Sequence, residues 1–145
     1  MVVIDASVYV SRMHRQEDNH LESVRLLRVV AARRVPVVCP EILLPEVAAA
    51  VARGLDDTGL GYRAAAHLRT LPGHRFIAVD RALSGLAARL AAEYRLRGSD
   101  AIYAALARRE GAHLITWDRQ QRERAAGVVE TLTPVEALAA LEADG

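Results

Sequence analysis

The order of apolar and polar residues predicts short strands that alternate with longer helices along the chain. Short, continuous apolar runs predict buried strands, because they are too short for helices. The predicted strands are Val2–Ile4, Val35–Val38, Phe76–Val79, His113–Thr116 and Val128–Glu130. Helical spacing of apolar residues predicts Ala6–Met13, His20–Arg33, a helix that carries Glu46, Leu60–Leu71, Arg81–Arg97, Ser99–Glu110, Arg119–Ala125 and a final helix after Thr133. This alternation predicts a three-layer α/β domain with a central parallel sheet of about five strands.

Proline and glycine mark the expected ends of some helices. Pro40 suits the first turn of a helix, whereas Pro45 is expected to kink or restart the same helix. Gly54 is expected to end it. Thr133 and Glu136 form a capping-box pattern, with a proline at the first helical position, which predicts the start of the terminal helix.

Composition narrows the class of protein. With 145 residues, of which 52% are hydrophobic and 26% charged, the chain is expected to form a single globular domain over residues 1–145. Cys39 is the only cysteine, so we expect no internal disulfide and a reducing, cytoplasmic location. The chain enters a strand pattern without a secretory leader, and no apolar run approaches the length of a membrane span. We therefore expect no membrane partner.

The net charge of +1 can conceal an asymmetry. If four of the acidic residues lie together in one pocket, as argued below for Asp5, Glu46, Asp100 and Asp118, the rest of the chain carries 19 basic residues against 18 − 4 = 14 acidic ones. Every basic residue is arginine, which suits planar, bidentate recognition of phosphate better than lysine does. A coding bias toward alanine and arginine explains the same composition and is the stronger interpretation.

Four acidic residues stand where predicted strands end or predicted helices begin. Asp5 and Asp118 each follow a buried strand, Asp100 opens a helix, and Glu46 lies early in another. Because the carboxyl ends of parallel strands line one crevice, we expect these carboxylates to share a pocket. Each pair would repel by roughly 4 kcal/mol at about 4 Å and an effective dielectric near 20. Such a cluster needs bound cations or raised pKa values, and Mg²⁺ or Mn²⁺ is the simpler answer.

Each acid also has a purely structural interpretation. Asp5 and Asp118 suit the N-caps of the helices that follow them, and Asp100 suits a first helical turn. Glu46 is harder to explain in this way, because it lies on the side of its helix that is expected to pack, and a buried glutamate needs a partner. Asp80 also follows a predicted strand, but N-capping explains it well.

Other chemistries lack their motifs. The five histidines show no i, i+4 pair and no cysteine companion, which argues against a zinc site. The chain has no glycine-rich phosphate loop, nucleophile elbow or redox cysteine pair. Trp117 and Tyr103 are interpreted as packing residues, and Asp56 and Asp57 as a solvated loop.

Around its acids the chain resembles the PIN domain family, and most closely the VapC-like toxins of prokaryotic toxin–antitoxin modules. The matching segments, spread from residue 2 to about residue 120, are Val3–Ser7, Pro45–Val47, Ser99–Ala107 and Leu114–Asp118. The resemblance implies strand order 3-2-1-4-5 and Mg²⁺- or Mn²⁺-dependent ribonuclease activity. It also implies a homodimer and inhibition by a small antitoxin protein.

The resemblance assigns roles to individual residues. The acidic quartet of the family falls on Asp5, Glu46, Asp100 and Asp118. The hydroxyl positions that support the pocket by hydrogen bonds fall on Ser7 and Thr116. Many relatives carry a further acid two residues after the last aspartate, whereas this chain has Gln120, so a second metal ion is expected to be held less tightly.

These observations favour a metal-dependent endoribonuclease. Asp5, Asp100 and Asp118 are expected to bind Mg²⁺ or Mn²⁺, while Glu46 completes the site or orients the attacking water. Candidate contacts to the phosphates of the RNA substrate are Arg53, Arg119 and Arg122. An exposed arginine on a helix is more often only a solvated residue.

Rival functions fit less well. A response-regulator receiver uses a lysine, which this chain lacks, and a haloacid-dehalogenase-like phosphatase needs Asp-x-Asp, whereas Asp5 is followed by Ala6 and Ser7. Two alternatives stay open: a catalytically inactive PIN-like module that binds RNA or protein, and a housekeeping RNA-processing nuclease. Four mutually repelling acids argue against an inactive site, because an unused pocket has no physical reason to keep them. The RNA target does not follow from these residues.

Overall fold

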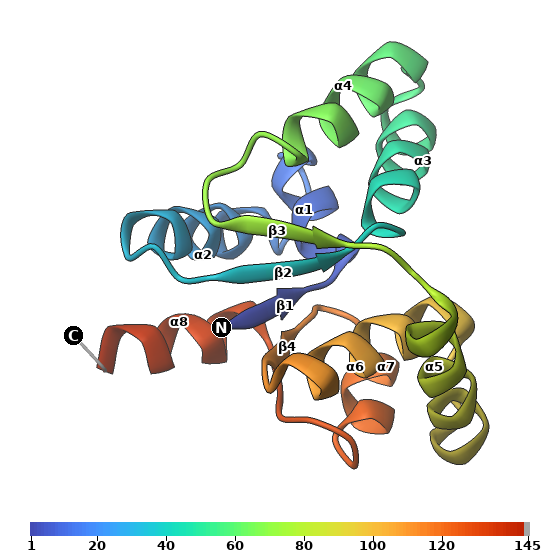
Figure 1. The fold of residues 1–145 in the computed structure, drawn as a ribbon. Helices are drawn as coiled ribbons and strands as arrows, with labels where there is room; N and C mark the ends of the chain where they lie inside the picture. The colour runs from blue at the N-terminus through green and yellow to red at the C-terminus, as the bar shows by residue number, and fades with distance from the viewer. Residues whose placement is uncertain (144–145) are drawn as a thin grey trace.

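The computed structural model of the protein describes residues 1–143 and consists of strands and helices in regular alternation (Figure 1). In chain order the elements are β1 (Val2–Ile4), α1 (Ala6–Met13), α2 (His20–Ala32), β2 (Val37–Pro40), α3 (Leu43–Leu55), α4 (Thr58–Leu68), β3 (His74–Ile77), α5 (Arg81–Tyr94), α6 (Gly98–Glu110), β4 (His113–Ile115), α7 (Arg119–Ala125), β5 (Thr131–Leu132) and α8 (Pro134–Ala143). Among these residues, no helix has both the length and the hydropathy to cross a membrane.

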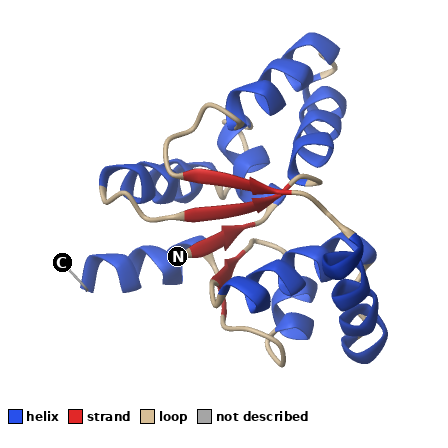
Figure 2. Ribbon diagram, viewed as in Figure 1, coloured by secondary structure: helices blue, strands red, loops and turns tan. Residues whose placement is uncertain are grey.

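The strands form one parallel sheet in the order β3-β2-β1-β4-β5, which confirms the predicted order. Figure 2 shows strands of this sheet side by side, with helices around them. β1 lies at the centre, where Val2 pairs with Val37 of β2 and with His113 of β4. Because all pairs are parallel, the carboxyl ends of the strands open at one edge of the sheet. In Figure 1 the strand arrowheads point toward the region bordered by α3 on one side and α5 to α7 on the other.

Helices flank the sheet and complete the predicted α/β architecture. α6 contacts β1, β2 and β4, while α1 packs against α2 and α3, and α2 packs against α8. The apolar residues of β1 and β4 are buried, as expected for parallel strands covered on both faces. α6 presents Ala101, Ala104 and Ala105 to this core, and all three are fully buried. Their small side chains let the helix that carries Asp100 lie close to the strands.

Two strands, β2 and β3, begin at other residues than predicted. β2 starts two residues after the start of the predicted strand Val35–Val38, because the N–H of Val35 still bonds the carbonyl of Val30 at the end of α2, at 2.9 Å. β3 starts two residues before the predicted strand Phe76–Val79, since His74 already pairs with β2. Hydrophobicity located both strands, while the pairing register set their bounds.

The last strand is misplaced in the prediction. It occupies Thr131–Leu132 rather than Val128–Glu130. The amides of Val128 and Val129 both bond the carbonyl of Ala125, at 2.8 and 3.1 Å, and so complete a turn after α7. Their apolar side chains pack against the core from that turn and do not belong to a strand.

Proline and glycine act differently from the prediction around α3. Pro40 ends β2 and pairs with Ile77, so it does not open a helix. Pro45 lies in the first turn of α3, where the helix needs no N–H from it, and the expected restart is wrong. α3 continues past Gly54 and is capped by Asp56, which adopts the left-handed conformation with φ of 49°.

Caps account for several polar residues outside the acid pocket. Asp80 accepts a hydrogen bond from the N–H of Leu83 at 2.8 Å, which confirms it as the N-cap of α5. Asp57, predicted as part of a solvated loop, caps α4 in the same way. The capping box of Thr133 and Glu136 at α8 is confirmed by reciprocal hydrogen bonds.

The predicted helix Arg81–Arg97 ends three residues early, at Tyr94. Arg95 then takes a left-handed conformation, with φ of 55°, and breaks the helix. Arg97 is extended and becomes the N-cap residue of α6. This turn places Arg97 beside the first turn of α6, next to Asp100.

Candidate active site

Four acidic side chains from four elements converge at the carboxyl edge of the sheet. Asp5 caps α1 directly after β1, and Asp118 caps α7 after β4. Glu46 and Asp100 lie in the first turns of α3 and α6. Burial, and after it the negative charge of Asp5, raises the pKa of both Glu46 and Asp100. The acids therefore influence one another, as residues of a single pocket must.

Asp5 is buried, with an exposed fraction of 8%. One carboxylate oxygen accepts a hydrogen bond from the N–H of Ser7 at 2.9 Å. The other lies 3.4 Å from Nε2 of Gln121, which donates to it. Both donors are neutral, and within residues 1–143 no arginine or histidine pairs with Asp5. Its negative charge is therefore left without a cationic partner in this part of the chain.

Glu46 accepts a short hydrogen bond from a buried tyrosine. The hydroxyl of Tyr103 donates to Oε2 of Glu46 at 2.6 Å, and Tyr103 itself is fully buried. Burial raises the pKa of Glu46, the hydrogen bond from Tyr103 acts in the opposite direction, and the charge of Asp5 raises the pKa further. A carboxyl group with a raised pKa is suited to accept a proton near neutral pH.

Arg97 joins the remaining two acids. Its Nε donates to Oδ2 of Asp100 at 2.8 Å, and one of its terminal nitrogens donates to Oδ2 of Asp118. Burial raises the pKa of Asp100 even though Arg97 acts against this shift. Burial also acts to raise the pKa of Asp118, but hydrogen bonds from the N–H of Gln121 and from Arg97 outweigh it and lower that pKa.

Two hydroxyl side chains fix the loop after β4 against the start of α1. Oγ of Ser7 lies 3.3 Å from Oγ1 of Thr116 and accepts a hydrogen bond from the N–H of Trp117 at 3.1 Å. Oγ1 of Thr116 accepts from the N–H of Asp118 at 3.0 Å. The indole of Trp117 donates to Ser23 on α2 at 2.8 Å. This network holds Asp118 on the same side of the sheet as Asp5.

The oxygen donors of the pocket suit a hard divalent cation, but the side chains are not arranged around a common metal position. Within residues 1–143, no three His, Cys, Asp or Glu side chains are arranged to hold a metal ion. The guanidinium of Arg97 forms ion pairs with Asp100 and Asp118. Carboxylate oxygens are the preferred ligands of Mg²⁺ and Mn²⁺, and the buried Oε1 of Gln121, beside Asp5, has no hydrogen-bond donor among the described residues. The oxygen donors of the pocket therefore suit such an ion by their chemistry, and two of the carboxylates are paired with Arg97.

Three residues of this pocket were missed or misread in the sequence. The sequence gives no sign of the role of Arg97, because its pattern places this residue at the end of the preceding helix. Gln121 follows Asp118 at helical spacing and is fully buried, yet a single polar residue in a polar segment gives no signal. Tyr103 was interpreted as a packing residue. It does pack, but its position three residues after Asp100 on a helix also aims its hydroxyl at the pocket.

The arginines proposed as phosphate contacts lie in different surroundings. Arg53 lines a cavity of about 540 Å³ together with Ser7 and Glu46, beside the acids. Arg119 is exposed and pairs with Glu123 at 2.7 Å. The guanidinium of Arg122 donates to the backbone carbonyls of Thr116 and Trp117, so it supports the loop that carries Asp118.

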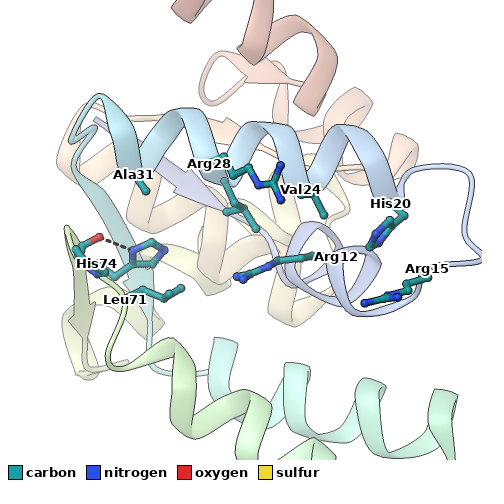
Figure 3. Close-up of a pocket in the computed structure, with 10 residues that line it drawn as sticks. Arg12, Arg15, His20, Val24, Arg28, Ala31, Leu71 and His74 are labelled. Carbon is teal, nitrogen blue, oxygen red and sulfur yellow. Dashed lines mark hydrogen bonds between the residues drawn. The ribbon is translucent and has the colours of Figure 1, made fainter.

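A second, basic groove of about 700 Å³ lies between α1, α2 and the segment that precedes β3 (Figure 3). The groove is lined by Arg12, Arg15, His20, Val24, Leu27, Arg28, Ala31, Leu71, Pro72 and His74. The three arginines have no ion-pair partner within the described chain. Their charge attracts anionic groups, but the groove contains none of the four acids and is separate from the candidate active site.

Comparison with protein families identifies a match over most of the chain. The family model for the PIN domain matches residues 2–127. No curated protein matches the chain at a significant level.

Solved structures share the fold at low sequence identity. The toxin VapC20 of Mycobacterium tuberculosis, which cleaves the sarcin–ricin loop, is 22% identical, with a TM-score of 0.71 over 90% of this chain and 98% of that one. FitAcB of Neisseria gonorrhoeae is 21% identical, with a TM-score of 0.70 over 93% and 99% of the two chains. A toxin–antitoxin complex from Klebsiella pneumoniae is 19% identical, with a TM-score of 0.64 over 92% and 98%. At these identities the likeness shows a shared fold.

Proposed function

This chain belongs to the PIN domain family, and we propose that it is a metal-dependent endoribonuclease that cleaves RNA phosphodiester bonds. The observation that carries this proposal is the coupling of acids from separate elements. Asp5, Glu46 and Asp100 meet at the carboxyl edge of the sheet, and the charge of Asp5 acts on both of the other two. Carboxylates that are largely removed from water and repel one another cost stability, and binding of a cation offsets that cost.

We assign the roles as follows from the contacts in the pocket. Asp5, Asp100 and Asp118 would hold Mg²⁺ or Mn²⁺ through their carboxylate oxygens. When bound, such an ion supplies activation of the attacking water and neutralisation of charge on the phosphate.

Glu46 orients the attacking water and receives its proton, and the hydrogen bond from Tyr103 keeps the carboxylate in place. Arg53, in the cavity beside Glu46, is the strongest candidate of the three predicted arginines for a contact to RNA phosphate. The corresponding roles of Arg119 and Arg122 stay predictions.

The biological setting that we propose is a toxin–antitoxin pair. VapC20 of Mycobacterium tuberculosis is a toxin, and other proteins of the same fold are found in complexes of a toxin with an antitoxin. We propose that this chain is likewise inhibited by a small antitoxin protein, and that it forms a homodimer in the cytoplasm. Binding to the product of a reading frame directly upstream, with loss of nuclease activity, would support a toxin. Its absence would favour a housekeeping RNA-processing nuclease.

One observation favours a catalytically inactive binding module instead. Arg97 already neutralises part of the charge on Asp100 and Asp118, so two of the four acids are stable without metal. Asp5 and Glu46 have no such partner within the described residues, and the inactive alternative leaves their presence unexplained.

A nuclease assay separates an enzyme from a binding module. Purified protein is incubated with a mixture of transfer, ribosomal and messenger RNA in Mg²⁺ or Mn²⁺, or in EDTA, and new RNA ends are sequenced. We expect cleavage only with metal, and we expect Asp100→Asn to abolish it without unfolding the protein.

Asp56→Asn is the matched control, because Asp56 lies outside the pocket and asparagine tolerates its left-handed conformation. Cleavage that persists in EDTA, or that both variants lose equally, would contradict the proposed role of the acids.

A further inference from the structure

Arg97 has an unusual position for an arginine near a candidate metal site. It precedes the first turn of α6 as the N-cap residue, and its guanidinium spans the space between two acids from different elements. Nε bonds Oδ2 of Asp100 at 2.8 Å, and a terminal nitrogen bonds Oδ2 of Asp118. These are two of the three carboxylates proposed to hold the metal ion, so the arginine and the ion compete for the same oxygens.

The three side chains differ in how firmly they are held. The side chain of Arg97 is 56% exposed, whereas those of Asp100 and Asp118 are 11% and 31% exposed. Asp118 is also fixed by its bond to the N–H of Gln121 at 2.9 Å. Ion pairs of an exposed arginine contribute little net stability, because water replaces the lost contacts. Arg97 can therefore swing outward while both carboxylates stay in place.

A divalent ion changes what surrounds the guanidinium. Once the ion holds the carboxylate oxygens, a positive charge beside it is repelled unless an anion lies between them. The scissile phosphate is such an anion, and guanidinium binds phosphate oxygens through two parallel hydrogen bonds. Arg119 and Arg122 are engaged with Glu123 and with backbone carbonyls, contacts that metal binding does not break. Arg97 alone among these three loses its partners when the ion arrives.

We propose that Arg97 is an exchangeable cation of the active site, which pairs Asp100 with Asp118 in the metal-free protein and contacts the scissile phosphate in the metal-bound one. This inference rests on the proposed nuclease function and adds a residue to it. It makes two predictions of opposite sign. Removing the guanidinium should strengthen metal binding, because a competitor is lost, and should slow cleavage, because a phosphate contact is lost. A residue that only supported the fold would weaken both.

The test uses the full chain and the variants Arg97→Gln and Arg97→Lys. Mn²⁺ binding is measured by isothermal titration calorimetry in the absence of RNA, and kcat and KM for RNA cleavage are measured at saturating Mn²⁺. We expect Arg97→Gln to bind Mn²⁺ about three- to tenfold more tightly than the parent. We expect its kcat/KM to fall about ten- to a hundredfold. Arg97→Lys retains a positive charge, so both quantities should lie between those of the parent and of Arg97→Gln.

Arg75→Gln is the matched control. The side chain of Arg75 is also 56% exposed and pairs with a carboxylate, Glu110, at 2.6 Å, but it lies on β3 away from the acids. It should leave Mn²⁺ affinity and cleavage unchanged. Weaker or unchanged Mn²⁺ binding in both Arg97 variants would overturn the proposal, and so would parent-like cleavage by Arg97→Gln. A parent protein that neither binds Mn²⁺ nor cleaves RNA would instead refute the nuclease function itself.

Discussion

Tyr103→Phe isolates the contribution of one hydroxyl group to the candidate site. The tyrosine ring is fully buried in α6, and its O–H donates to Oε2 of Glu46 at 2.6 Å. Phenylalanine keeps the ring and its packing, so the substitution leaves no cavity and removes only the hydrogen bond. Any change in stability therefore reports on the interaction with Glu46.

The size of the effect depends on the charge of Glu46. A hydrogen bond to an ionised group contributes about 1.5–3 kcal/mol, and one between neutral groups about 0.5–1.5 kcal/mol. Because burial raises the pKa of Glu46, the stability that this carboxyl contributes is present below its unfolded pKa and is lost as pH rises through the raised folded value. The tyrosine offsets part of that loss, since its bond strengthens as Glu46 ionises. Tyr103→Phe should thus lower the free energy of unfolding by about 1 kcal/mol near pH 4 and about 2 kcal/mol near pH 8.

The assay is denaturant unfolding in EDTA at both pH values, for the parent, Tyr103→Phe, Glu46→Gln and the double variant. Glutamine keeps the acceptor oxygen and removes the charge, so in that background the tyrosine substitution should cost about 1 kcal/mol at either pH. Tyr62→Phe is the control, because Tyr62 is 75% exposed on α4. A cost for Tyr103→Phe that does not grow with pH, or that Glu46→Gln leaves unchanged, would refute a charge-assisted bond.

Three further predictions concern the rest of the pocket and the assembly. Asp5→Asn keeps an N-cap but removes a charge that acts on Glu46 and Asp100, so in EDTA it should be more stable than the parent by on the order of 1 kcal/mol. Metal should raise the melting temperature of the parent more than that of the variant. A variant that is less stable than the parent, with equal shifts for both proteins, would contradict a shared metal pocket. Thr116→Val removes the acceptor of the Asp118 N–H from a fully buried position and should cost about 1–3 kcal/mol by denaturant unfolding, whereas Thr116→Ser should not. Light scattering of the purified protein at micromolar concentration should show a homodimer. A molar mass that corresponds to monomer only would refute the predicted dimer.

The periodicity of the sequence was informative wherever a segment is buried on a single, regular pattern. β1 and α1 have the predicted bounds, and α7 begins directly after Asp118 as expected. The shifts occur where tertiary pairing decides. Val128 and Val129 look like a strand because they are apolar, but hydrogen bonds to Ala125 hold them in a turn, and β5 pairs with β4 only after it. The hydrophobic pattern of a sequence indicates which segments are buried, but it does not give the register in which the strands pair.

The same distinction holds for the acids. That Asp5 and Asp118 follow neighbouring strands can be read from the chain, because strand ends in a parallel sheet share an edge. The hydrogen bond from Tyr103 to Glu46 cannot, since it joins residues of two helices whose separation depends on how closely the alanines of α6 pack on the sheet. The contact of Gln121 with Asp5 cannot be predicted from the sequence either, because it depends on how deeply the first turn of α7 is buried.

Arg97 shows how a single turn can set the electrostatics of the whole pocket. Leucine and arginine are good helix formers, so nothing local in Arg95, Leu96 and Arg97 predicts that α5 stops before them. The left-handed conformation of Arg95 ends α5, and the extended conformation of Arg97 makes it the cap residue of α6 that reaches Asp100 and Asp118. Arg97 then forms ion pairs with two of the four carboxylates. The charge that remains on Asp5 and Glu46 is why we expect metal binding, and not a rearrangement of arginines, to complete the site.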